Sequence, residues 1–167
     1  PFTLSDGWEW CRLGDVALQI HYGYTASANH KIRCNRLLRI TDIQNNRVDW
    51  AAVPGCEIAD DKFDQYELSN GDILIARTGG TVGKTYLVSG VEELKAIFAS
   101  YLIRVVPSSV LDCRYLKIAL ETPLYWAQLA NKTTGTGQPN VNATALSRLY
   151  VPLPALPEQT RIVARVD

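Results

Sequence analysis

The segment Asn70-Gly-Asp-Ile-Leu-Ile-Ala-Arg-Thr-Gly-Gly-Thr-Val-Gly-Lys-Thr85 decides how the rest of the chain is arranged. An Asn-Gly turn opens it, an apolar run from Ile73 to Ala76 follows, and a basic, glycine-rich loop ends it. A short β-branched run bounded by turn residues predicts a strand, and continuous hydrophobicity predicts burial on both faces. Tyr86-Leu-Val88 is again apolar, so we expect a second strand. The segment therefore predicts a central strand that delivers a polar loop to one edge of the fold.

The loop resembles a nucleotide-binding P-loop but lacks two features of that motif. A P-loop has a glycine five positions before the glycine that precedes its lysine, and position 78 here is a threonine. It also needs a following helix whose first N–H groups hold phosphate, whereas the residues after Thr85 are typical of a strand. A hairpin connection with positive φ at its glycines explains the loop. Such a loop also offers free backbone N–H groups to DNA phosphates.

Size and composition predict one ordinary globular domain. The chain has 167 residues, of which 47% are hydrophobic and 9% aromatic. This is enough for a hydrophobic core that needs no disulfide or metal ion to stabilise it. Its four cysteines are scattered, with no CxxC pair, so we expect reduced thiols in a cytoplasmic protein and no bound metal. No apolar run approaches the ~20 residues of a membrane span, and we expect neither a signal peptide nor membrane association.

Charges cancel in sum but are separated along the chain. There are 17 basic and 17 acidic residues, and the lack of a basic surplus argues mildly against nucleic-acid binding. Residues 31–47 contain five basic residues and one acid, whereas residues 49–72 contain seven acids and one lysine. No acid occurs between Glu121 and Glu158. A chain sorted in this way can present one positive and one negative face, although charged runs also occur as plain solvated surface.

The remaining patterns predict a mixed α+β fold with a strongly twisted sheet or partial barrel and a few short helices. Asp112 and Thr122 are suitable N-caps, and Pro123 suits a first helical turn. We expect strands at 37–40, 47–50 and 96–106, a strand or short helix at 16–20, and helices at 57–67, after Asp112, after Thr122 and from Pro157.

Two polar segments carry residue types that contact DNA. Residues 21–35 mix aromatic, hydroxyl and basic side chains. Residues 131–142, Asn-Lys-Thr-Thr-Gly-Thr-Gly-Gln-Pro-Asn-Val-Asn, are the most polar stretch and contain no acid. Asn and Gln can pair with adenine through two hydrogen bonds, and Thr can contact the thymine methyl. Both segments also have a simpler explanation, as a surface loop and a flexible connector.

The C-terminal residues predict a helix with an apolar stripe. It opens at Pro157, with Glu158 well placed for the helix dipole, and Ile162, Val163 and Val166 begin the stripe. A helix of under three turns with an uncovered stripe is short for an independent element. We therefore expect that another copy of the chain covers the stripe, or that the sequence is a fragment of a longer chain.

The tail Pro152-Leu-Pro-Ala-Leu-Pro-Glu-Gln-Thr-Arg-Ile-Val163 resembles the signature that closes a target recognition domain in the specificity (S) subunits of type I restriction–modification systems. In that family it leads into a long spacer helix. Three further stretches resemble the family, in the right order, so that the likeness spans essentially all 167 residues. They are Gly7-Trp8 with Arg12-Leu-Gly-Asp15; Gly71-Asp-Ile-Leu74 with Arg77, Gly79 and Gly83; and Gly137-Gln-Pro-Asn-Val141 followed by Leu146.

The resemblance implies a DNA-reading module that is not itself an enzyme. An S subunit contains two such domains separated by antiparallel helices, each reading one half of a split DNA target. It positions modification (methyltransferase) and restriction subunits that do the chemistry. Here it implies a target recognition domain at 1–155 and the start of a spacer helix at 156–167. The chain has no FxGxG methyl-donor motif and no Asn-Pro-Pro-Tyr motif, so we expect no catalytic residue and no cofactor.

On this hypothesis the partners are double-stranded DNA, the modification and restriction subunits, and a second copy through the C-terminal helix. Phosphate contacts would give a sequence-independent, salt-sensitive affinity, and other side chains would read bases. Phosphate contact is expected from Lys31, Arg33, Arg77, Lys84 and Lys132. Base readout is expected from Tyr22, Thr134, Gln138, Asn140 and Asn142, and Thr78, Thr133 and Thr136 complete the predicted DNA-binding set.

Two alternatives stay open. A protein-interaction domain of a restriction complex, without its own readout, would bind the modification subunit through the tail helix and prefer no DNA sequence. A nucleotide-binding enzyme would use the Gly79–Lys84 loop and bind ATP saturably.

Overall fold

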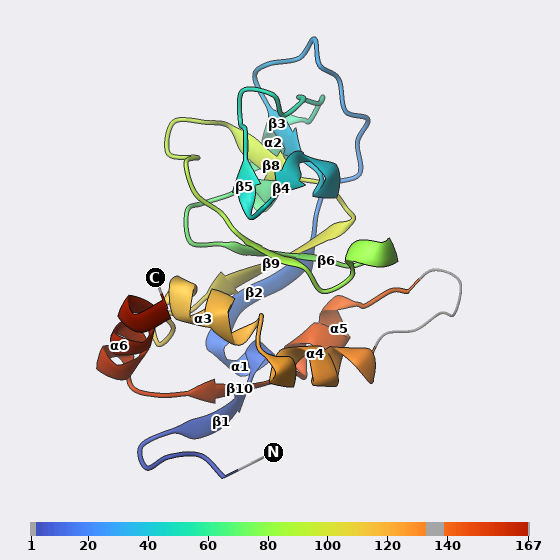
Figure 1. The fold of residues 1–167 in the computed structure, drawn as a ribbon. Coiled ribbons are helices and arrows are strands. Elements are labelled where there is room, and N and C mark those ends of the chain that lie inside the picture. Colours follow the sequence, from blue (N-terminus) through green and yellow to red (C-terminus); the bar gives the residue numbers. More distant parts are fainter. Residues whose placement is uncertain (1–2, 133–138, 167) are drawn as a thin grey trace.

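The computed structural model describes residues 3–132 and 139–166 of the chain. The elements are β1 (Glu9–Arg12), α1 (Leu13–Val16), β2 (Ala17–Tyr22), β3 (Arg36–Leu38), the 3-10 turn η1 (Ile40–Asp42), β4 (Ile43–Gln44), β5 (Arg47–Val48), α2 (Asp60–Tyr66), β6 (Ile73–Ala76), the 3-10 turn η2 (Gly79–Thr81), β7 (Thr85–Leu87), β8 (Ala96–Phe98), β9 (Leu102–Pro107), α3 (Cys113–Ala119), α4 (Pro123–Ala130), α5 (Ala143–Ser147), β10 (Tyr150–Leu153) and α6 (Leu156–Val166). A four-stranded sheet lies at the centre, with α1, α3–α6 and the β1–β10 pair on one side and α2 with the β3–β8 and β4–β5 pairs on the other (Figure 1).

The central sheet has the strand order β2-β9-β6-β7, and every neighbouring pair is antiparallel. β6 is buried at each of its four residues, which confirms the predicted central strand. The loop after β6 returns as β7, the predicted second strand. Since β7 is a strand, no helix follows the glycine-rich loop, and the nucleotide-binding alternative loses its structural basis.

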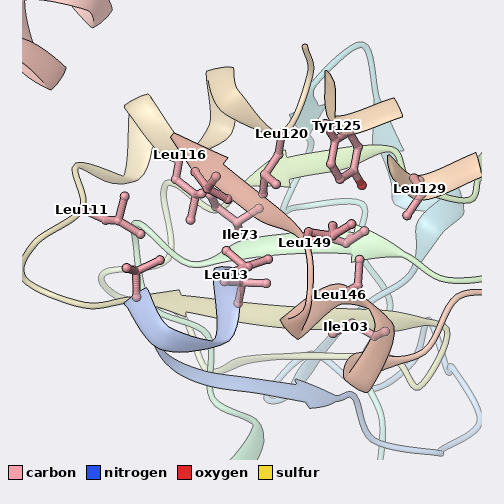
Figure 2. Close-up of a cluster of buried hydrophobic side chains, with 14 of the residues drawn as sticks. Leu13, Ile73, Ile103, Leu111, Leu116, Leu120, Tyr125, Leu129, Leu146 and Leu149 are labelled. Atoms are coloured by element: carbon pink, nitrogen blue, oxygen red, sulfur yellow. The ribbon is translucent and has the colours of Figure 1, made fainter. Parts of the chain in front are cut away.

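Alternating side chains of β6 fill two hydrophobic clusters, one on each face of the sheet. Ile73 and Ile75 belong to the cluster under the helices, where Figure 2 shows Ile73 near Leu116 of α3. Leu74 and Ala76 belong to the cluster under β3 and β8. Full burial of one such aliphatic side chain stabilises the fold by roughly 1.5–3 kcal/mol. The double-sided core explains why β6 reads as one unbroken apolar run.

Residues 96–106 do not form the single strand that their pattern predicts. The chain forms β8, turns at Ser100 and Tyr101, and continues as β9. β8 pairs in parallel with β3, whereas β9 pairs antiparallel with β2 and β6. The prediction was wrong because the turn contains neither glycine nor proline, so the local pattern gives no sign of a break.

The mixed α+β class is confirmed, and none of the sheets formed by the described residues closes into a barrel. Predicted N-caps are also confirmed: the Asp112 carboxylate accepts from the backbone N–H of Arg114 at 2.8 Å, and Thr122 Oγ1 accepts from that of Tyr125 at 3.3 Å. Two local details differ from what the sequence led us to expect. β5 ends at Val48, short of residue 50, and α5 is an additional helix.

Gln159 anchors the first turn of α6 to the rest of the molecule. Its side chain is fully buried, and its Nε2 donates to the carbonyl oxygens of Val110 and Pro154, both at 2.9 Å. Its Oε1 accepts from the N–H of Asp112 at 2.8 Å. Helix α6 thereby packs beside α3 (Figure 1), with Val163 buried.

A second buried polar group, Arg104 of β9, ties the sheet to the turn before β6. Its guanidinium donates to His21 Nε2 at 2.8 Å and to the Asp72 carboxylate at 3.4 Å, and also to the carbonyl oxygen of Glu67. It also lies over the ring of Phe98, 5.4 Å from the centroid. A buried charge is tolerated only when it is paired and hydrogen-bonded in this way.

Within residues 3–132 and 139–166, no helix combines the length and the apolar character needed to cross a bilayer. The same part of the chain has no group of three or more His, Cys, Asp or Glu side chains arranged to hold a metal ion.

Candidate nucleic-acid interface

Several predicted contact residues meet at one end of the central sheet. At this end β2 and β6 finish, while β9 and β7 begin. Tyr22 is the last residue of β2, Arg77 follows β6, Lys84 precedes β7, and Tyr101 precedes β9. We call this edge, defined by these four residues, the loop end. The antiparallel register therefore gathers side chains that lie far apart in the sequence.

Tyr22 and Arg77 form the centre of the loop end. The Arg77 guanidinium carbon lies 4.6 Å from the centroid of the Tyr22 ring, a cation–π contact. The Tyr22 hydroxyl accepts a hydrogen bond from the N–H of Ala143 at 3.0 Å, at the start of α5. The Tyr22 ring therefore packs against the Arg77 guanidinium, and its hydroxyl binds the backbone at the start of α5.

Residues 139–141 pair with the loop after β6. Asn140 forms an antiparallel bridge with Thr78. The N–H of Gly79 donates to the Pro139 carbonyl at 3.0 Å, and the N–H of Val141 donates to the Arg77 carbonyl at 2.9 Å. The glycine-rich loop after β6 and the described end of the 131–142 segment are therefore one structural unit, with Asn140 beside Thr78.

Asn142 is the N-cap of α5, a structural role that was not predicted from the sequence. Its Oδ1 accepts from the N–H of Ala145 at 2.7 Å and caps α5. An asparagine directly before Ala-Thr-Ala-Leu is the signal that could have predicted this cap. Its side-chain oxygen is thus already engaged.

Four of the predicted residues, Thr133, Thr134, Thr136 and Gln138, lie outside the described residues. Lys132 directly precedes them, and its N–H donates to the carbonyl of Leu129 at 2.9 Å at the end of α4.

Lys31 and Arg33 lie on the exposed loop that rises from β2 to β3 (Figure 1). Arg33 Nη1 donates to the carbonyl of Ala51 at 2.9 Å. No hydrogen bond or ion pair between described residues joins either side chain to the loop end. The structure therefore does not gather these two cations with Arg77 and Lys84.

Gly83 fixes how the loop returns to the sheet. Its φ of +86° confirms the predicted left-handed glycine, and a Cβ at this position would lie 2.2 Å from Leu129 Cδ2. The hydroxyl of Tyr125 donates to the Gly83 carbonyl at 2.8 Å, and burial raises the pKa of this tyrosine. Lys84 follows this anchored glycine, and its side chain is exposed and makes no ion pair with any described residue.

One nitrogen of the Arg77 guanidinium forms no hydrogen bond with the described residues. This nitrogen, Nε, is buried. A buried donor without a partner costs about 1–3 kcal/mol. The guanidinium as a whole, rather than this buried nitrogen, is a suitable donor to phosphate oxygens, because hydrogen bonds between two ionised partners are the strong ones.

A groove of about 740 Å³ opens beside Thr78 and was not predicted. It lies between residues 24–28, η1 and the turn between β8 and β9, where Tyr101 is 61% exposed. A neighbouring hollow of about 270 Å³ shares Thr41 with the groove and reaches Lys84. No local sequence signal indicates the groove, because its lining comes from segments far apart in the chain.

The fold is thus a buried antiparallel sheet that presents polar and cationic loops from one end. The chain belongs to the type I restriction modification DNA specificity domain family, whose model matches residues 5–167. This family membership confirms the resemblance to S subunits.

Relatives of the chain are longer proteins. It is 27% identical over 174 residues to the specificity subunit of type I restriction enzyme EcoAI from Escherichia coli, covering 100% of this chain and 29% of that protein. It is 22% identical over 170 residues to the MjaVIII specificity subunit from Methanocaldococcus jannaschii, covering 98% of this chain and 39% of that protein.

Solved structures of type I systems share the fold. The HsdS subunit from Thermoanaerobacter tengcongensis superposes with a TM-score of 0.74 at 25% identity, over 99% of this chain and 38% of that one. A chain from a structure of type I R-M complex assembly superposes with a TM-score of 0.78 at 24% identity, over 99% of this chain and 39% of that one. The chain thus spans between 29% and 39% of these proteins.

Proposed function

We propose that this domain recognises one half of a split DNA target for a type I restriction–modification system. Membership of the DNA specificity domain family supports the proposal. The observation that carries it is the register of the central sheet, which places Tyr22, Arg77 and Lys84 at one end, with Asn140 bridged to Thr78 beside them. Loops held out by a rigid scaffold are where recognition residues are concentrated.

In the proposed mechanism, cations hold the DNA backbone and amides read bases. Arg77 and Lys84, with Lys132, contact phosphates, so the affinity falls steeply with salt. Asn140, and Gln138 in the segment outside the described residues, offer amides that can pair with adenine. Phosphate contacts fix the register of the domain on the duplex, and base contacts carry the specificity.

Catalysis is assigned to other chains. We propose that methyltransferase and restriction subunits act on DNA that this domain has positioned, and that residues 1–155 are the recognition unit. Residues 156–167 then begin a spacer helix, whose partly exposed stripe at Ile162 and Val166 packs against another helix. Self-association through the same stripe is the alternative use of this surface.

The test is selection of bound duplexes from a random pool, with the modification subunits present, followed by titrations on the selected half-site. Lys84→Ala should weaken binding to all sequences alike and lower the slope of log affinity against log salt by about 1. Asn140→Ala should cost about 1–3 kcal/mol on the selected half-site alone. Lys62→Ala is the matched control, because Lys62 is exposed on α2, which lines neither the groove nor the hollow.

Two results would contradict the proposal. If Lys84→Ala changed which sequence is preferred, the division between phosphate contact and base readout would be wrong. If the wild-type chain bound the modification subunit but enriched no sequence, the domain would be a protein-interaction module without its own readout.

A further inference from the structure

The groove beside Thr78 is lined by hydroxyl groups that have nothing to bind inside the protein. None of these hydroxyls has a hydrogen-bond partner among the described residues, whereas Thr81, Thr122 and Thr160 each donate to a nearby carbonyl. A hydroxyl both donates and accepts, so the lining can match either kind of polar edge. The six hydroxyls belong to Tyr24, Thr25, Thr41, Thr78, Ser100 and Tyr101.

Methyl groups line the groove together with these hydroxyls. Ala26, Ala28 and Ala99 contribute to its lining, and each of its threonines adds a γ-methyl. Tyr101, 61% exposed, forms an aromatic rim. The surface therefore combines apolar contact with two-way hydrogen bonding.

Among the described residues that line the groove, none carries an unpaired charge. The single cation among them, Arg39, donates through Nε and Nη2 to the two carboxylate oxygens of Asp42, at 3.0 and 2.8 Å. This fork–fork pair neutralises the guanidinium and occupies the two donors that would otherwise form a bidentate contact. Free cations lie beside the groove instead, at Arg77 and at Lys84.

These features exclude some ligands and favour one. A neutral lining gives no advantage to phosphate. Guanine is typically read by a free Arg or Lys and the cytosine amino group by Asp or Glu, and the groove offers none of these. Threonine and alanine methyls match the 5-methyl of thymine, and hydroxyls can bond to the polar edges of either base of an A·T pair.

We propose that this groove reads an A·T pair of the half-site by packing its methyl groups against the thymine 5-methyl. The inference rests on the proposed function, because it names the bases that this DNA-reading domain takes. Thr78 borders the groove directly after Arg77. One backbone step therefore separates the proposed phosphate contact from the base-reading surface.

The experiment replaces thymine by deoxyuridine, one position at a time, in the duplex selected from the random pool. Uracil lacks only the 5-methyl group. Wild-type chain with its modification subunits should bind at least one uracil-substituted duplex about fourfold more weakly, the effect of one buried methyl. Substitutions at thymines outside the half-site should change nothing.

Two variants of Thr41 then locate the contact. Thr41 is exposed and lines both the groove and the neighbouring hollow. Thr41→Ser removes the methyl and keeps the hydroxyl, so the ratio between thymine and uracil duplexes should fall from about fourfold towards one. Thr41→Val keeps the branched shape and removes the hydroxyl, so affinity for the selected half-site should fall while the thymine preference stays. Thr25→Ser repeats the test on the facing segment, and Thr160→Ser on α6 is the control.

The outcomes separate the two proposals. If the wild-type chain enriches no sequence, both fail. A selected half-site that needs no A·T pair, or a thymine preference that survives unchanged in Thr41→Ser and Thr25→Ser, overturns the assignment of the groove and leaves DNA recognition standing.

Discussion

Two regions of the molecule differ in how far their polar groups are hydrogen-bonded: the contact around Gln159 between α6 and the rest of the fold, which we call the junction, and the loop end. At the junction, the fully buried amide of Gln159 makes three hydrogen bonds, each at 2.8 or 2.9 Å. At the loop end, Arg77 Nε is buried without a partner among the described residues, and the more exposed hydroxyls of the groove bond to no described residue either. Polar groups that hold a fold together are normally satisfied inside it. Groups left unsatisfied at one edge point to a ligand from outside.

Burial alone therefore does not separate structural from functional polar residues. Arg104 is only 6% exposed and carries a charge, yet its guanidinium has partners on β2, on α2 and at Asp72 directly before β6. Arg77 is less buried and less well paired. Arg104 and Arg77 therefore differ more in how completely their guanidinium groups are hydrogen-bonded than in how deeply they are buried.

The largest effect is expected from breaking the satisfied junction. Gln159→Leu keeps the approximate volume but leaves two carbonyls and one N–H buried without partners. We expect the free energy of unfolding to fall by about 3–5 kcal/mol, measured by urea denaturation with an unchanged m-value. Gln128→Leu is the control, because Gln128 also makes two hydrogen bonds to Tyr150 but is only partly buried, and should lose about 1 kcal/mol. Equal losses in the two variants would contradict the comparison.

Much of the satisfied region could be predicted from the sequence, because its signals are local. The unbroken run of β6 indicated a central strand, and Asp112 and Thr122 marked helix starts within a few residues. Residues 96–106 failed because the same alternation continues through the turn at Ser100. Arg104 could not have been recognised, since its partners His21 and Asp72 lie 83 and 32 residues away in the sequence.

For the candidate site, the sequence indicated residue types but not their assembly. Basic and amide residues in glycine-containing loops singled out Arg77 and Asn140, and the structure brings them together. The same reasoning included Lys31 and Arg33, which the structure places on a different loop. The groove went unnoticed because its hydroxyls come from four separated segments, and only the packing of β2, η1, β6 and β9 brings them together.

A smaller effect, visible only as pH changes, is expected at His21. Arg104 Nε donates to His21 Nε2 at 2.8 Å, so the histidine is the neutral acceptor. Burial, and secondarily the charge of Arg104, lower the pKa of His21 from 6.5 to about 4. His21 is therefore protonated near pH 6.5 in the unfolded chain but only near pH 4 in the folded chain. This histidine's contribution to stability is complete above pH 6.5 and is lost as the pH falls towards 4.

The variant His21→Gln isolates this contribution, because glutamine offers an acceptor oxygen and does not titrate. We expect the stability of the wild type relative to the variant to fall by up to about 3 kcal/mol between pH 7 and pH 4, measured by urea denaturation at each pH. Burial also raises the pKa of Asp72, a contribution of opposite sign that both proteins share and that largely cancels in the difference. A difference that stays constant with pH would show that His21 is not held neutral by Arg104.

The smallest change in stability is expected at the loop end, from the substitution Arg77→Met. The same substitution at Arg104 is its control. Arg77→Met removes a buried donor that has no partner among the described residues, a gain of about 1–3 kcal/mol, and loses the cation–π contact with Tyr22, worth about 0.5–1 kcal/mol. We expect the free energy of unfolding to stay unchanged or to rise by up to about 2.5 kcal/mol, while DNA affinity falls at least about tenfold through the lost phosphate contact.

Arg104→Met is the matched control for that experiment, because it removes the same group from the satisfied region. It leaves the Asp72 carboxylate buried and without its cation, so we expect a loss of about 3–5 kcal/mol in the free energy of unfolding. Denaturation curves and salt-dependent DNA titrations on both variants check the pair. If Arg77→Met destabilised the fold as much as Arg104→Met and left DNA affinity intact, Arg77 would belong with the structural residues. The unpaired nitrogen would then no longer mark the site where DNA binds.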